Sequence, residues 1–240
     1  MIVSPSHPAG FGRRTGHGVL LRCSVVAAAA VMALSACSSG DDRAPQASAT
    51  PANRICDGAL DASAQAALKR LGGSDTFKEL TGKTSAGQPN QFSLSRAAAH
   101  LHDEVELRSR CTVYLPDDTS GAPLVQLDFE TSNKPPIRAE VEKQEPNARL
   151  TFYPLGVYAA TSDDNSTSLY FTCTTKGADG EASYVDGGIF SSGDQLKGNS
   201  TSKDRMTILN SVSRRLAEEL GCASEANLPS AVPDGETVTS

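Results

Sequence analysis

The sequence predicts an α+β fold: one domain in which an antiparallel sheet of about five strands is packed by about three helices and held by two disulfides. Two features predict the mixed content. Some segments alternate apolar and polar residues, whereas others place apolar residues three and four positions apart. Four cysteines in the same stretch predict the disulfides. The domain is expected to span residues 55–222.

Three helices are expected, and each begins at a residue whose short side chain can accept a hydrogen bond from the first turn: Asp61, Ser93 or Ser95, and Thr201. The first should run to Leu71, because two glycines follow it. The last has the strongest signal, since Thr201 and Asp204 match a capping box and an apolar stripe follows at helical spacing.

Strands are expected between the second and third helices, at residues 111–115, 124–129, 150–160, 168–174 and 184–190. The first two of these segments, and the next two, are each separated by a short polar turn, which predicts two antiparallel hairpins. Tyr158 and Tyr170 fall on the second hairpin. They either line a binding face of the sheet or, as is more common, cover the core with their hydroxyls at its rim.

Residues 1–36 have the three parts of a signal peptide: a basic start, an apolar run over 23–34, and the small pair Ser35-Ala36. The apolar run is about a dozen residues, whereas a bilayer-spanning helix needs roughly 20. A cleaved leader is therefore expected, with an uncleaved membrane anchor as the alternative. The rest of the chain should then lie outside the cytoplasmic membrane.

The run Leu34-Ser35-Ala36-Cys37 resembles a bacterial lipobox. The resemblance implies that Cys37 carries a diacylglyceryl group and becomes the new N-terminus, although plain cleavage after Ala36 is a second possibility. Two acyl chains hold a protein stably on a bilayer. Residues 37–54 are then expected to be a flexible tether, and 223–240 a flexible tail, because both are polar and poor in large apolar residues.

The remaining cysteines predict two disulfides, since an even number in an oxidising compartment usually pairs: Cys56, Cys111, Cys173 and Cys222. Four cysteines allow three connectivities. Cys56–Cys111 and Cys173–Cys222 are favoured, because each joins a cysteine beside a helix end to one on a strand. A zinc site is the alternative, but the chain has no Cys-x-x-Cys, and no metal is expected.

Charge limits the partners. The chain has 22 basic and 28 acidic residues, and its net charge is −6. The leader contains three of the basic residues and no acidic residue, so the chain from Cys37 onward carries −9. Nucleic acid is excluded, because binding phosphates requires clustered Lys and Arg. The expected partners are the membrane, through the lipid on Cys37, and an envelope protein, a cell-wall component or a small ligand. No cofactor is expected.

Catalytic signals are weak. His100 and His102 each have a carboxylate four residues on, but on a helix the two rings lie about 200° apart and cannot share a metal ion. Gly-x-Ser-x-Gly is absent. The sequence therefore favours a non-enzymatic binding module. The alternative is an envelope hydrolase with its active site near His100 and His102, which would need a deep cleft that contains a histidine.

The chain also resembles a broad set of uncharacterised actinobacterial lipoproteins. The likeness is carried by the lipobox and by three further segments, at residues 56–60, 170–173 and 216–222. It implies an extracytoplasmic, disulfide-bonded domain. It implies no activity, because members of the set have none assigned.

Overall fold

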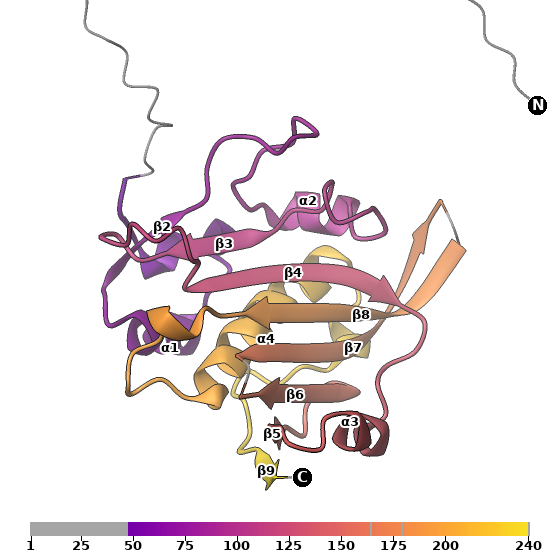
Figure 1. Ribbon diagram of the computed structural model, residues 1–240. Coiled ribbons are helices and arrows are strands. Elements are labelled where there is room, and N and C mark those ends of the chain that lie inside the picture. Colours follow the sequence, from indigo (N-terminus) through magenta and orange to yellow (C-terminus); the bar gives the residue numbers. More distant parts are fainter. Residues whose placement is uncertain (1–47, 164, 179, 240) are drawn as a thin grey trace, which may run out of the picture. The chain divides into compact units, whose positions relative to one another are not determined.

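The computed structural model describes residues 48–163, 165–178 and 180–239 (Figure 1). The predictions for the signal peptide, for Cys37 and for residues 37–47 of the tether lie outside these residues.

Within the described residues, nine strands form one sheet in the order β1-β2-β3-β4-β8-β7-β6-β5-β9, and all neighbours are antiparallel. The strands are β1 Thr50–Pro51, β2 Thr76–Glu79, β3 Cys111–Tyr114, β4 Val125–Ser132, β5 Arg149–Phe152, β6 Tyr158–Ser162, β7 Ser166–Gly177, β8 Gly180–Phe190 and β9 Glu236–Thr239. The α+β class, the single domain and both predicted hairpins, β3–β4 and β6–β7, are confirmed.

The prediction of about five strands is wrong. The segment 150–160 contains two strands, β5 and β6, because the chain turns sharply between them at Gly156 (φ 60°). A Cβ at this position would lie 2.3 Å from the carbonyl oxygen of Tyr170. The other additions, β1, β2 and β9, are only two to four residues long, too short for an alternating pattern to stand out.

All three predicted helices are present, at α1 Ala62–Gly72, α2 Leu94–Ala99 and α4 Ser202–Glu219. The Asp61 carboxylate accepts from the Ala64 N–H at 2.9 Å, and Thr201 and Asp204 form the capping box. Two further short helices, α3 Arg138–Gln144 and α5 Ala223–Ala226, had not been predicted. Short 3-10 turns occur at η1 Ala52–Arg54, η2 Cys56–Gly58 and η3 Gly193–Gln195.

The main core lies between the sheet and the helices α1 and α4, which pack behind it (Figure 1). Phe171 and Leu169 of β7 and Leu209 of α4 are fully buried there. A smaller apolar cluster of Leu150, Phe152 and Ala160 lies apart from it and is covered by Val141 of α3. No helix formed by the described residues lies over the front of β4, β8 and β7 (Figure 1). We call this surface the open face.

The predicted disulfide connectivity is confirmed. Cys56 pairs with Cys111 and Cys173 pairs with Cys222, each with 5.4 Å between the Cα atoms. The second bond joins β7, inside the sheet, to the residue that follows the last turn of α4. It therefore ties the helix layer directly to the strand layer.

Residues at both ends of the domain, predicted to be a tether and a tail, instead contribute to the fold. Ala52 is buried in the main core, as are Ala226 and Val232 near the other end. Strand β9 pairs with β5 along its whole length, and Val238 packs on the smaller apolar cluster. Single apolar residues in polar surroundings produce no periodic pattern, so this packing could not be predicted from local sequence.

Candidate functional site

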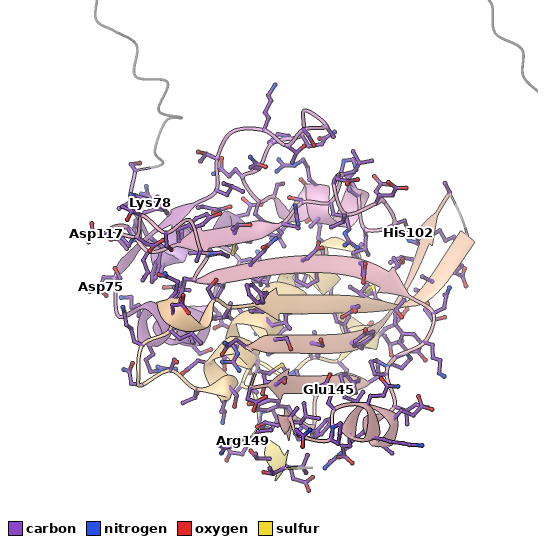
Figure 2. All side chains as sticks on the ribbon, in the orientation of Figure 1. Asp75, Lys78, His102, Asp117, Glu145 and Arg149 are labelled. Carbon is purple, nitrogen blue, oxygen red and sulfur yellow. A yellow bond between two sulfur atoms is a disulfide. The ribbon has the colours of Figure 1, made fainter. Side chains whose placement is uncertain are left out.

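The two histidines do not form a common site. Helix α2 ends at Ala99, so the predicted helical pairs with later carboxylates cannot form. His100 Nδ1 instead lies 2.6 Å from the Asp103 carboxylate, and His102 Nε2 bonds to Thr175 Oγ1 of β7 at 3.0 Å. Figure 2 shows His102 near the β7–β8 turn, far from Arg149. Within the described part of the chain, neither histidine lines any cavity considered below.

No group of three or more His, Cys, Asp or Glu side chains among residues 48–163, 165–178 and 180–239 is arranged to hold a metal ion. In the same ranges, no helix has the length and apolar character needed to cross a bilayer.

The two tyrosines singled out in the sequence lie on the front of the sheet: Tyr170 is on the open face, whereas Tyr158, on β6, packs on the smaller apolar cluster. Tyr158 and Tyr170 are direct cross-strand partners on β6 and β7, and their rings meet edge to face with 5.8 Å between centroids. Tyr170 is also opposite Asp186 of β8, and its hydroxyl donates a hydrogen bond to that carboxylate. Both tyrosines are partly exposed.

Asp186 belongs to an acidic group on the open face. Burial raises the pKa of the Asp186 carboxyl from 3.8 to about 6, although the hydrogen bond from Tyr170 opposes this shift. Glu130 and Asp128 raise the pKa further, whereas Arg108, which forms ion pairs with both of these residues, lowers it. The cavity at this point is only 120 Å³, so it accommodates little more than a few water molecules.

A pH-dependent stability follows. Because the folded state favours the protonated Asp186 carboxyl, its contribution to stability is complete below about pH 4 and is lost as the pH rises through about 6. Relative to Asp186→Asn, the wild type should lose on the order of 3 kcal/mol of unfolding free energy between about pH 4 and pH 7. Urea denaturation at both pH values measures this difference. Asp117→Asn, at an exposed carboxylate, is the control; equal pH profiles for wild type and Asp186→Asn would contradict the account.

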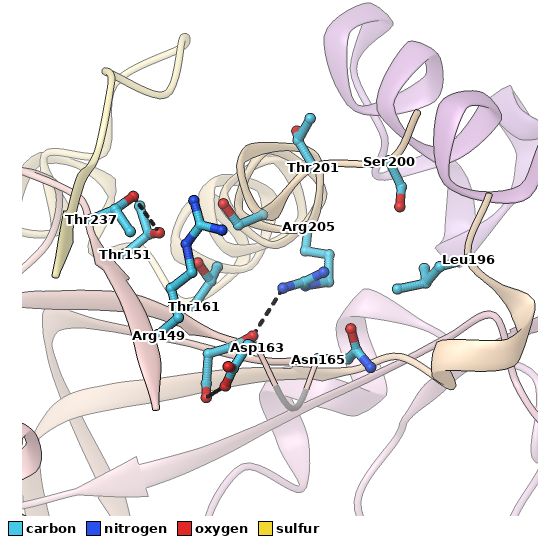
Figure 3. A pocket seen from close by; sticks show the side chains of 12 residues that line it. Arg149, Thr151, Thr161, Asp163, Asn165, Leu196, Ser200, Thr201, Arg205 and Thr237 are labelled. Atoms are coloured by element: carbon cyan, nitrogen blue, oxygen red, sulfur yellow. Dashed lines mark hydrogen bonds between the residues drawn. The ribbon is translucent and has the colours of Figure 1, made fainter. Parts of the chain in front are cut away.

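A cavity larger than the one at Asp186 lies on the helix side of the sheet, between the first turn of α4 and strands β5, β6 and β9 (Figure 3). It has a volume of about 440 Å³. We call it the threonine pocket, and its principal lining residues are Thr151, Thr161, Thr237, Arg149, Arg205 and Ser202. The name reflects the strand register, which aligns four threonines across β9, β5, β6 and β7: Thr237, Thr151, Thr161 and Thr167.

The hydroxyls in this row differ in their bonding. Thr151 and Thr237 bond to each other at 2.9 Å, and Thr167 accepts from Arg205 Nε at 3.4 Å. Thr161 is only 2% exposed, and its hydroxyl has no hydrogen-bond partner among the described residues. A buried polar group without a partner costs about 1–3 kcal/mol. The fold therefore retains a buried hydroxyl, without a partner in the described part of the chain, on a residue that lines the pocket.

Positively charged and donor groups line the pocket. The side chain of Arg149, from β5, points into the pocket (Figure 3). Arg205, from the first turn of α4, is only 6% exposed and donates from Nη2 to the carbonyl oxygen of Ser162 at 3.1 Å. Asp163 is the acidic residue on the rim. The pocket is thus rich in hydrogen-bond donors contributed by separate elements of the fold.

A larger hollow of about 590 Å³ between α1 and α4 is a weaker candidate. Its charged residues already have partners, since Arg70 Nε donates to the Asp204 carboxylate at 2.9 Å and Lys203 pairs with Asp234. The threonine pocket, with its unsatisfied hydroxyl, is therefore the candidate functional site.

The sequence did not reveal this pocket. Its threonines are spread from residue 151 to 237, and only the register of strands distant in sequence brings them together. One signal was available: Arg205 lies four residues before Leu209, on the apolar stripe of the last helix. A buried arginine on such a stripe usually serves a specific contact.

Comparison with known protein families, curated proteins and solved structures finds no match to this chain. Its class is therefore defined by its own features: a single α+β domain with a nine-stranded antiparallel sheet in the described residues and two disulfides. The disulfides indicate an oxidising, extracytoplasmic environment.

Proposed function

We propose that this protein is a lipid-anchored binding module of the cell envelope, that its lipid is attached to Cys37, and that its ligand binds in the threonine pocket. The leader sequence, the lipobox-like run and the two disulfides support a location on the outer face of the cytoplasmic membrane.

The observation that carries the binding role is the Thr161 hydroxyl. Natural domains leave few buried polar groups unpaired, and those that remain need an explanation. A ligand in the pocket would supply the missing hydrogen-bond partner. Binding would then remove the free-energy cost of leaving the Thr161 hydroxyl unpaired. The pocket volume also falls in the range of about 300–1,000 Å³ that is usual for small-molecule sites.

The hydrolase alternative has less support. A hydrolase near His100 and His102 would place an imidazole inside a cleft, where it could exchange a proton with the substrate. Each histidine instead has its own separate partner, Asp103 or Thr175. We therefore propose a role in binding rather than catalysis.

Photo-crosslinking in living cells tests this proposal. A photoreactive residue at Ser200, on the pocket rim, should capture an envelope component after irradiation of intact cells. The matched control is the same photoreactive residue at Gln126 of β4. Gln126 and its cross-strand partner Phe190 lie on the face of the sheet opposite the threonine pocket, so this position should capture nothing. Capture at Gln126 alone, or at neither position, would contradict the proposed site.

A further inference from the structure

We infer that the ligand of the threonine pocket carries an oxyanion, a carboxylate or phosphate group, which is bound between Arg149 and the first turn of α4 and accepts a hydrogen bond from Thr161. This inference rests on the proposed function and specifies the chemical class of the ligand.

Arg149 supplies the first argument. Five other arginines form ion pairs with carboxylates: Arg70, Arg108, Arg138, Arg214 and Arg215. Arg149 forms no ion pair with any residue in the described ranges, although Asp163 lies on the same pocket. Its guanidinium offers the planar array of donors that fits carboxylate and phosphate groups. A charge of this kind, directed into a pocket, favours an anionic ligand.

Helix α4 supplies the second argument. It is 18 residues long, and its first residues, Thr201 and Ser202, line the pocket. The N–H groups of a first helical turn have no partner in the helical ladder, although the capping box already binds that of Asp204, and this end of the helix carries a partial positive charge. The nearby carboxylate of Asp204 is held by the capping box and by Arg70, so its negative charge is compensated.

Thr161 supplies the third argument, which is independent of charge. Thr161 lines the same pocket, and its buried hydroxyl has no partner among the described residues. A hydroxyl can donate to an oxyanion as well as accept. Arg205 has a positioning role, because its bonds to Thr167 and to the Ser162 carbonyl hold β7 and β6, the strand that contains Thr161.

The negative charge of Asp163 should repel an anionic ligand. Removing this charge should therefore change the affinity for an anion in the opposite direction to the loss of Arg149. The exposed Asp163 carboxylate is the negative group that the described residues place on the pocket rim. Replacing it with asparagine removes like-charge repulsion and keeps the size of the side chain. An oxyanion should therefore bind more tightly to Asp163→Asn, whereas a cationic ligand should bind less tightly.

The test uses the complete mature lipoprotein, extracted from membranes in detergent, with inorganic phosphate, acetate and the neutral probe glycerol. Binding is measured by calorimetry and by the shift in melting temperature. We expect phosphate or acetate, but not glycerol, to bind and to raise the melting temperature. Phosphate and acetate as separate arms distinguish the two oxyanion groups.

Variants then locate the site. Arg149→Ala and Thr161→Val should each raise the Kd for the bound anion at least about tenfold, since a hydrogen bond to a charged group contributes about 1.5–3 kcal/mol. Asp163→Asn should lower the Kd. Arg54→Ala, at another exposed arginine, and Thr112→Val, at another buried threonine, are the matched controls and should leave it unchanged.

The result for Thr161→Val separates binding from folding. Valine removes the unsatisfied hydroxyl, so the ligand-free variant should melt at the same temperature as the wild type or above it while its anion affinity falls. The inference is overturned if neither anion binds, or if Arg149→Ala and Thr161→Val bind it as the wild type does. If the crosslinker at Ser200 still captures an envelope component in that case, the binding module stands and only the anionic class of its ligand is lost.

Discussion

Replacing both Cys173 and Cys222 with serine is expected to lower the free energy of unfolding by about 4 kcal/mol. The two cysteines are 49 residues apart, and the bond between them restricts a loop of that length in the unfolded chain. It also joins β7, a strand inside the sheet, to the end of α4. Domains of this size have net stabilities of about 5–15 kcal/mol, so the loss is a large fraction of the total.

Urea denaturation of the exported wild type and the Cys173→Ser/Cys222→Ser variant measures this loss. Cys56→Ser/Cys111→Ser is the matched comparison, because its loop of 55 residues predicts a similar reduction. A midpoint unchanged by the loss of Cys173 and Cys222, or free thiols at these positions in the wild type, would contradict the disulfide assignment.

Changing Cys37 to alanine is expected to release the protein from the membrane fraction into the soluble fraction. Each buried methylene of an acyl chain contributes about 0.8 kcal/mol to membrane binding, so two chains provide a stable anchor. The remainder of the chain cannot replace them by electrostatic attraction, since its net charge of −9 repels anionic lipids.

Cell fractionation followed by detection of the protein checks this expectation. Cys23→Ala is the control, because Cys23 lies in the proposed leader and should be removed during maturation. Equal membrane retention of the wild type and of Cys37→Ala would show that something other than a lipid on this cysteine holds the protein.

Elements with strong local signals were predicted correctly. The capping box at Thr201 and Asp204 identified α4, and the polar turn after Ser162 identified the β6–β7 hairpin. The disulfide pairing followed from the same elements, since each bond joins a strand to the end of a helical segment. By contrast, α3 has only Val141 as a large apolar residue, so no helical stripe marked it.

The candidate site depends on information that local patterns do not contain. The threonine row requires β9 to pair with β5, and β9 has only the partly buried Val238 as an apolar residue. Likewise, a threonine in a strand gives no indication that its hydroxyl lacks a partner. That property of Thr161 appears only when α4, β5 and β6 are assembled around the pocket.

The most direct measurement is native mass spectrometry of the protein extracted from the membranes of its own cells. The account predicts one species that begins at Cys37, carries a diacylglyceryl group, has no free thiol and retains a small ligand, and it predicts that the ligand is absent from the species formed by Thr161→Val. A chain that keeps residues before Cys37, or a ligand retained equally by Thr161→Val, would contradict it.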